Sequence, residues 1–153
     1  MPTVACEITA PVTPEVAFRE THDYARRKAW DPFIRTYRFL DGPAESLQRG
    51  SRVWVRAHNG LTMTVAYEAL DPPNFVAMQM TQGPWFFRKF TGSWRFSRCD
   101  EGARIAFRYG FTARPGLLTP ILRWALQRDM TRRVEALQTH LATLTVEPVA
   151  AGC

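Results

Sequence analysis

The last third of the chain carries an apolar residue every three or four positions, and this pattern limits the possible folds more than any other. Such spacing places side chains on one face of an α-helix. A helix of about 25 residues is roughly 37 Å long, so it could cross a whole sheet. Thr119 and Pro120 predict its start, as the capping residue and the first helical residue. The shared face contains Leu118, Leu122, Leu126, Met130, Val134, Leu137, Leu141 and Leu144.

Turn sequences divide residues 33–113 into about six strands. Asn59-Gly60 favours a two-residue hairpin of type I′, because that turn needs a positive φ at both central residues. Connections as short as these join antiparallel neighbours. The other turn sequences are Asp41-Gly42-Pro43, Arg49-Gly50-Ser51, Asp71-Pro72-Pro73-Asn74, Gln82-Gly83-Pro84 and Asp100-Glu101-Gly102.

The N-terminal third predicts one strand followed by two short helices. Residues 3–10, "TVACEITA", alternate as a strand, and Thr13 with Pro14 begins a helical segment. That segment ends at Trp30-Asp31-Pro32, because a residue before proline is pushed out of the helical region. The predicted class is therefore α+β. We expect one domain over residues 1–153, with an ordered core of about 3–145 and a disordered tail at 146–153.

Hairpin pairing predicts which side chains share the inner face of the sheet, since directly opposed residues point the same way. The turn at Asn59-Gly60 would pair Trp54 with Val65 and Arg56 with Met63. The loops after Asp71 and Cys99 would pair Tyr67 with Met78, Val65 with Met80, Trp94 with Phe107, and Phe90 with Phe111. The predicted inner face also includes His58, Leu61, Ile105 and Tyr109.

The stretch "GPWFFRKFTGSWRF", residues 83–96, has six aromatic residues among fourteen. From residue 89 onward the aromatics alternate with Lys89, Thr91, Ser93 and Arg95, as in a half-buried strand. This pattern predicts that Phe90, Trp94 and Phe96 point inward while the cations face water.

The inner face is rich in methionine and aromatic residues, with a few polar groups, which indicates a ligand cavity. A tightly packed core is the other interpretation. An empty cavity of about 300 Å³ would cost roughly 7 kcal/mol, so such a space should hold water or ligand. The predicted ligand-binding residues are Trp54, Arg56, Met63, Val65, Tyr67, Met78, Met80, Phe90, Trp94, Phe107, Tyr109, Leu122, Leu126 and Met130.

The order of elements resembles the helix-grip fold of the START-like superfamily, also called SRPBCC. The motifs "APVTPEVAFRETHDYARRKAWDPFI" and "ALDPPNFVAMQMTQGPWFFRKFTGSWRFSRCDEGARIAFRYGF", with the final helix, are most similar to its polyketide cyclase/dehydrase and lipid-transport branch. The resemblance covers about residues 3–145. It implies a curved sheet of about seven strands around the long helix, and an internal cavity for lipids, sterols, polyketides, quinones or other aromatic molecules.

The resemblance leaves catalysis open. Aromatase/cyclase members of the superfamily carry a Trp-x-Ser-x-Arg run, and its nearest counterpart here is Trp54-x-Arg56-x-His58, which lacks the serine. Arg56 could hold an oxyanion and His58 could move a proton, with Tyr109 as a further catalytic candidate. The alternative is that Arg56 and His58 are solvated near the hairpin tip. The expected function is binding, and possibly transport, of a small hydrophobic or aromatic ligand; the alternatives are a cyclase/dehydrase and a membrane-docking carrier of lipid or quinone.

Composition narrows the expected partners. The net charge is +6 and the pI about 9.8, but the short basic run "YARRKAW" is too small to indicate nucleic-acid binding. Three scattered cysteines, three scattered histidines and the lack of a nucleotide-binding glycine motif predict no metal and no cofactor. With no signal sequence and no long apolar run, we expect a cytoplasmic monomer or homodimer.

One amphipathic stretch, "LLTPILRWALQR", suggests transient membrane contact. Trp124 and nearby aliphatic side chains could enter a lipid surface while neighbouring arginines meet the headgroups. The other interpretation is an ordinary packing helix. The residues concerned are Leu117, Leu118, Ile121 and Trp124, with Arg114, Arg123 and Arg128.

Overall fold

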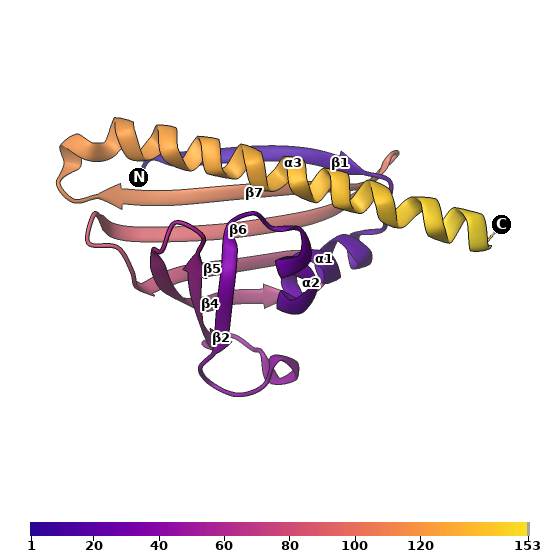
Figure 1. The fold of residues 1–153 in the computed structure, drawn as a ribbon, viewed down its shortest axis with the longest axis horizontal. Helices are drawn as coiled ribbons and strands as arrows, with labels where there is room; N and C mark the ends of the chain where they lie inside the picture. The colour runs from indigo at the N-terminus through magenta and orange to yellow at the C-terminus, as the bar shows by residue number, and fades with distance from the viewer. Residues whose placement is uncertain (153) are drawn as a thin grey trace.

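Seven antiparallel strands form one curved sheet, and a long helix lies along it (Figure 1). The computed structural model describes the backbone of residues 1–152 and the side chains of residues 1–144. The sheet order is β1-β7-β6-β5-β4-β3-β2. Its strands are β1 (Thr3–Ala10), β2 (Ile34–Phe39), β3 (Arg52–Ala57), β4 (Thr62–Asp71), β5 (Phe75–Gln82), β6 (Phe87–Cys99) and β7 (Gly102–Ala113).

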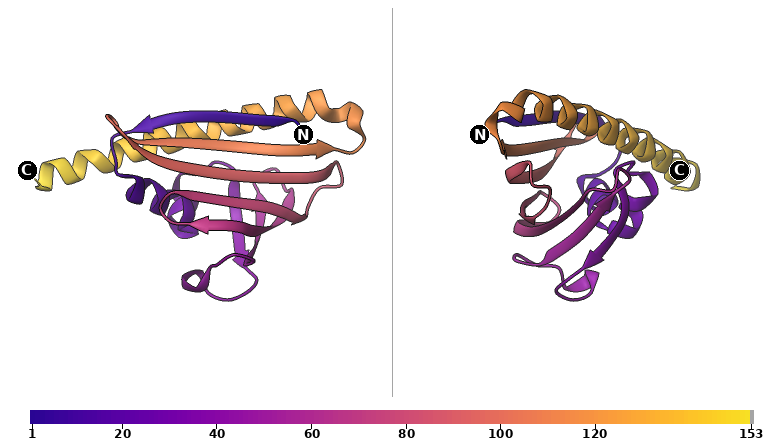
Figure 2. Two further views of the ribbon diagram at one scale, coloured as in Figure 1. Left: turned by 180° about the vertical axis from the view of Figure 1, so that it is seen from behind. Right: turned by 60° about the vertical axis from the view of Figure 1, so that its left-hand side comes forward.

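Three α-helices accompany this sheet, α1 (Pro14–His22), α2 (Tyr24–Trp30) and α3 (Thr119–Gly152), with short 3-10 turns η1 (Ala44–Ser46) and η2 (Gly116–Leu118). Figure 2 shows the sheet curving away beneath α3, with α1 and α2 grouped toward one end. The predicted helix-grip architecture is confirmed.

Polar caps fix the two short helices, as the sequence predicts. Thr13 Oγ1 accepts a hydrogen bond from Val16 N at 3.2 Å, and Pro14 occupies the first turn of α1. Asp23 separates the helices and caps α2 by accepting from Ala25 N at 3.1 Å. The α2 helix ends at Trp30, directly before Asp31 and Pro32. This places Asp31 at the junction between α2 and the sheet.

The register of β6 with β7 agrees with the prediction. Trp94 pairs with Phe107 and Phe90 pairs with Phe111. Tyr67 likewise pairs with Met78 in the β4–β5 hairpin. Phe90, Trp94 and Phe96 are buried, whereas Lys89 and Arg95 are exposed. The aromatic segment is therefore an inward-facing wall with cations on its outer side.

The register of β3 with β4 is one residue away from the prediction. Arg56 pairs with Thr62 and Trp54 pairs with Thr64, rather than with Met63 and Val65. The cause is the turn: Gly60 N donates to Ala57 O at 3.0 Å, and Ala57 N donates to Leu61 O at 2.9 Å. Gly60 has φ +90°, but Asn59 does not have a positive φ, so the turn is not type I′. A three-residue turn with one glycine in the left-handed region replaces it, and the slip turns the side chains of β3 to the other face.

The start of α3 also differs from the prediction. Thr119 is itself helical, and its Oγ1 donates to Gly116 O at 2.6 Å instead of capping the helix. The predicted apolar face is buried at Met130, Val134, Leu137 and Leu141. Within residues 1–152, neither α3 nor a shorter helix has the length and hydropathy of a membrane span. The predicted tail at 146–153 lies outside the residues whose side chains are described.

Candidate functional site

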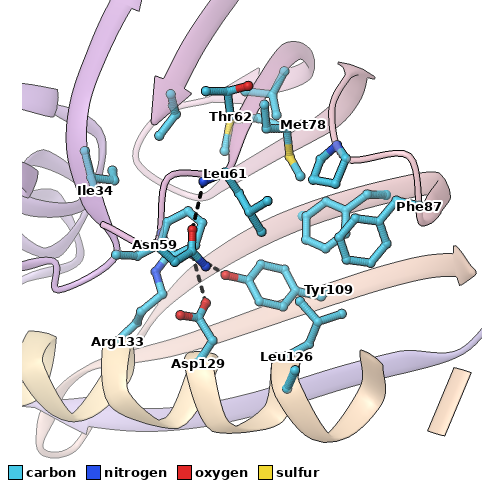
Figure 3. A pocket seen from close by; sticks show the side chains of 18 of the residues that line it. Ile34, Asn59, Leu61, Thr62, Met78, Phe87, Tyr109, Leu126, Asp129 and Arg133 are labelled. Atoms are coloured by element: carbon cyan, nitrogen blue, oxygen red, sulfur yellow. Dashed lines mark hydrogen bonds and ion pairs between the residues drawn. The ribbon is translucent and has the colours of Figure 1, made fainter. Parts of the chain in front are cut away.

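A cavity of about 260 Å³ lies between the inner face of the sheet and α3 (Figure 3). Its wall combines residues from β4, β5, β6 and β7 with residues from the first half of α3. Nine of the predicted binding residues line it: Met63, Val65, Met78, Phe90, Trp94, Phe107, Tyr109, Leu122 and Leu126.

Three predicted residues from the first hairpin lie outside the cavity because of the register slip. Arg56 and His58 are exposed to solvent. Trp54 lies beneath the guanidinium groups of Arg38 and Arg56, whose carbons are 5.3 and 5.2 Å from the ring centre. Val55, which lies between Trp54 and Arg56 in β3, lines the cavity instead.

Tyr67, Met80 and Met130 are also absent from the cavity lining. Tyr67 belongs to a separate buried cluster with Tyr24 and Val76, farther along the sheet. Met130 is fully buried in the main core, and Met80 packs against that core. These three side chains therefore belong to the packed interior rather than to the cavity lining.

The cavity reaches the surface beside two loops and α3. Asn59 and Leu61 from the β3–β4 turn, and Ala125 from α3, line the cavity and are exposed. Pro84 and Phe86, from the β5–β6 connection, complete this region, which we call the mouth. The mouth is formed by two short loops against one helix, so a ligand could enter without displacing a strand.

Stacked aromatic rings form one wall. The rings of Trp94 and Phe107 are 3.8 Å apart between centroids and inclined by only 11°. Phe90 and Tyr109 follow on the same side, 5.0 Å apart between centroids. Flat rings and methionine side chains suit a planar apolar guest.

One part of the cavity wall, which we call the inner end, contains charged groups that sequence reasoning missed. Arg27 Nε donates to Asp31 Oδ2 at 3.0 Å, and Arg133 Nη2 donates to the same oxygen at 2.9 Å. Phe33 N donates to Asp31 Oδ1 at 2.9 Å. Burial alone would raise the pKa of Asp31, but the charges of Arg133 and Arg27 lower this pKa to about 2. Asp31 is therefore a carboxylate that joins α2, the segment before β2, and α3.

Tyr109 and Asp129 lie beside Arg133 at the inner end, as Figure 3 shows. Arg133 Nη1 donates to the Tyr109 hydroxyl oxygen and lies 3.9 Å from Asp129 Oδ2. Burial raises the pKa of Tyr109, although the charge of Arg133 opposes that shift, so the phenol keeps its proton. Burial also raises the pKa of Asp129, and Arg133 again opposes the shift.

The sequence matches a known protein family over nearly its whole length. The family described as "Polyketide cyclase / dehydrase and lipid transport" matches residues 1–142. The chain belongs to this family. A search of curated proteins found no match.

Solved structures confirm the fold of this family member. A START superfamily protein from Mycobacterium smegmatis superposes with a TM-score of 0.79 at 11% identity, over 93% of this chain and 98% of that one. Ara h 8.0201 superposes with a TM-score of 0.73 at 18% identity, over 93% and 98%. The di-domain ARO/CYC BexL from the BE-7585A biosynthetic pathway gives 0.73 at 16%, over 99% of this chain but 48% of that chain. At such low identity, these likenesses concern the fold alone.

This member of the family also buries a histidine next to the aromatic wall. His22 Nδ1 lies 2.7 Å from Thr21 Oγ1, and its ring stacks on Phe18 at 4.8 Å between centroids. Its edge meets Trp94 at 5.9 Å. Burial, assisted by the charge of Arg27, lowers the pKa of His22 to about 3. The imidazole is therefore neutral at ordinary pH.

Local spacing contained a signal for the inner end. Arg27 lies three residues after Tyr24 and three before Trp30, so these residues share one face of α2, and all three are buried. Arg133 similarly follows Met130 by three positions within the buried face of α3. A charged residue that falls in phase with an apolar stripe is the pattern that indicates a buried ion pair.

Proposed function

We propose that this protein binds a small, mainly hydrophobic aromatic ligand in the cavity between the sheet and α3. The observation that carries the proposal is a cavity of about 260 Å³ with apolar and aromatic walls and a charged inner end. Small-molecule sites commonly combine an apolar wall with a few fixed polar groups. The volume lies just below the usual range for such sites, which favours a ligand of two or three rings.

The energy of an empty space supports occupancy. At about 24 cal/mol per Å³, an empty cavity of this volume would cost roughly 6 kcal/mol. A whole domain has a stability of only about 5–15 kcal/mol. Space of this size beside polar groups is therefore expected to contain water or ligand, and an apolar ligand gains by releasing the water.

The direct test uses a neutral fluorescent probe, N-phenyl-1-naphthylamine. We expect enhanced probe fluorescence on binding, with one probe per chain in a native mass spectrum. A panel of two-ring and three-ring quinones, flavonoids and short polyketide analogues should then displace the probe. Absence of both fluorescence enhancement and a bound species would contradict the proposal.

A second candidate function, a polyketide cyclase or dehydrase, is favoured by the groups at the inner end. Asp129 and Tyr109 lie beside Arg133 on the cavity wall, and both carry protons more readily than usual. Such groups can move protons at a substrate carbonyl while an arginine stabilises an enolate. The variants Asp129→Asn and Tyr109→Phe distinguish the two functions with a poly-β-ketone thioester as substrate. An enzyme should lose turnover by about 10²-fold or more, whereas a binding protein should show no turnover before or after the change.

A third candidate, a carrier that docks on membranes, is favoured by the surface beside the mouth. Trp85, Leu117, Ile121 and Trp124 are between 63% and 77% exposed. Arg114 N donates to Phe86 O at 2.9 Å, which holds the β7–α3 connection against the loop that bears Trp85. Residues 114–128 contain three arginines and no acidic residue. Exposed tryptophan with uncompensated arginine complements an anionic lipid surface.

Vesicle flotation tests this third candidate. The protein should float with phosphatidylcholine vesicles that contain phosphatidylserine, and less with phosphatidylcholine alone. The double variant Trp85→Ser/Trp124→Ser should lose flotation, whereas Leu40→Ser, which removes an exposed leucine elsewhere, should retain it. Flotation that ignores both lipid charge and the tryptophans would remove this candidate.

A further inference from the structure

The inner end of the cavity has more hydrogen-bond donors than acceptors. Both oxygens of Asp31 are already occupied, Oδ2 by Arg27 and Arg133, and Oδ1 by the backbone of Phe33. Asp31 therefore holds the two guanidinium groups in place but has little capacity left for a further donor. Its single negative charge matches only one of the two positive charges, and the other carboxylate, Asp129, lies 3.9 Å from Arg133 Nη1.

Two buried N–H groups beside the cavity lack an acceptor. Arg133 Nε and Trp94 Nε1 are buried, and neither has a hydrogen-bond partner among the residues whose side chains are described. Both residues line the cavity. An unpaired buried donor costs about 1–3 kcal/mol.

Tyr109 adds a third donor. Its hydroxyl oxygen accepts from Arg133 Nη1, so the hydroxyl proton remains for another acceptor. The second carboxylate beside these groups, Asp129, is 3.9 Å from Arg133 Nη1, beyond hydrogen-bond distance. Burial raises the pKa of Asp129, and the charge of Arg133 opposes that shift.

From this excess of donors we infer that the ligand is an aromatic acid whose carboxylate or phenolate lies at the inner end, against Arg133, Arg27 and Tyr109. The inference deepens the proposed function and rests on it. A guanidinium recognises a planar oxyanion with two parallel hydrogen bonds, which a neutral ester cannot match. The stacked pair Trp94 and Phe107 lies beside the same groups, with the guanidinium carbon of Arg133 5.4 Å from the Phe107 ring centre. A ring carrying an acidic group would thus contact the aromatic wall while its oxygens reach the arginines.

The test compares 2-naphthoic acid with methyl 2-naphthoate by isothermal titration calorimetry at pH 7. The two probes share their ring system and differ in the charge at one end. The unchanged protein should bind the acid about tenfold to a hundredfold more tightly, the ratio expected of a hydrogen bond to a charged group. Equal affinity would overturn the inference while leaving the proposed function standing. Failure of both probes to bind would contradict the proposed function at this ligand size, and the inference with it.

Variants assign the preference to the inner end. Arg133→Gln should abolish the preference for the acid and change the affinity for the ester by less than about threefold. Arg132→Gln is the matched control, because Arg132 is the exposed neighbour on the same helix. Arg27→Lys keeps the charge near Asp31 but loses the planar fork, so it should reduce the preference without removing Arg133. Retained preference in both Arg133→Gln and Arg27→Lys would overturn the assignment, and the acid–ester ratio of the unchanged protein stands even if a variant fails to fold.

Discussion

Charged side chains usually lie at the surface and apolar side chains inside. At this cavity the arrangement is the opposite: the inner end buries charged side chains, and the region of the mouth exposes apolar ones. At the inner end, the side chains of Asp31 and Arg133 are 0% and 5% exposed. On the surface beside the mouth, Trp85 and Trp124 are 71% and 63% exposed. Charged residues are rarely buried unless paired, and a contiguous set of exposed apolar residues often marks an interaction site. The comparison indicates that the inner end serves the fold and the ligand, whereas the mouth serves contacts with other molecules.

The difference should appear in the energetics. Removing one member of the buried ion pairs is costly, because each charge depends on its partners for the solvation that water no longer provides. The exposed tryptophans contribute little, because removing an exposed side chain leaves the core intact. Changes at the inner end should therefore alter unfolding, and changes at the mouth should alter only contacts with other molecules.

The largest expected effect is that of Asp31→Asn. Removing the carboxylate leaves Arg27 and Arg133 buried without a counter-ion, which should lower the free energy of unfolding by about 3–5 kcal/mol. Urea unfolding followed by circular dichroism measures the loss. Asp41→Asn is the control, since Asp41 forms an exposed pair with Arg52 and its loss should be far smaller. Similar losses in the two variants would contradict the distinction between buried and exposed pairs.

The next effect is the dependence of stability on pH through His22. Its pKa in the folded protein is about 3 against 6.5 when unfolded, so below pH 6.5 the unfolded state binds the extra proton. This group therefore stabilises the fold fully above pH 6.5 and loses its contribution progressively as the pH falls toward 3. Between pH 6.5 and pH 5 the loss should be about 2 kcal/mol.

The variant His22→Phe isolates this contribution, because phenylalanine can still stack on Phe18 but cannot titrate. Urea unfolding of both proteins at pH 7 and pH 5 should show a shallower pH dependence in the variant. His140→Gln is the control, because the side chain of that histidine is 25% exposed. An unchanged pH dependence in His22→Phe would show that His22 is not the group responsible.

A smaller effect is expected from filling the cavity at Gly92. Gly92 lies between Phe90 and Trp94 on the inner face, and a Cβ there would meet the Tyr109 ring at 3.7 Å, an ordinary contact. Gly92→Leu should weaken binding of N-phenyl-1-naphthylamine at least about tenfold, or 1.4 kcal/mol, without loss of stability. Ser93→Leu places the same side chain on the outer face and should leave probe affinity unchanged. Equal affinities in both variants would place the probe outside the cavity.

The smallest effect on stability is expected at the mouth. The double variant Trp85→Ser/Trp124→Ser should change the free energy of unfolding by no more than about 0.5 kcal/mol per site, since both rings are exposed. Thermal unfolding by circular dichroism is sufficient to check this. A loss comparable with that of Asp31→Asn would mean that the tryptophans support the fold, which would remove the contrast between the two ends.

Local signals explain how much of the fold the sequence could predict. Helix caps, turn residues and alternation each act over a few positions, and the α1, α2 and β6–β7 predictions depend on nothing longer. The short turn before Gly102, which has φ +129°, allowed the pairing of Trp94 with Phe107 to be predicted. Asn59-Gly60 was ambiguous, because the same dipeptide fits a two-residue and a three-residue turn. Because of that ambiguity, Trp54 and Arg56 were predicted on the inner face, whereas the structure places them on the outer face.

The inner end was harder to predict because it is not local. Asp31 and Arg133 are 102 positions apart, and only the folded chain brings them to 2.9 Å. A lone charge predicts a solvated position, since burying it without a partner is costly. A solvated position is therefore the ordinary expectation for the arginines of "YARRKAW", which include Arg27. The apolar wall required no such partner, so Phe90, Trp94 and Phe107 could be placed from alternation alone.

The sheet does not close into a barrel, so β1 and β2 each have a neighbouring strand on one side only within the described residues. An open strand edge can recruit another copy of the same chain and begin a fibril. On β2, Arg35 and Arg38 are both exposed, so two copies approaching through this edge would bring like charges together. The protein should therefore resist edge-to-edge polymerisation at low ionic strength, and added salt should weaken this protection by screening the arginines.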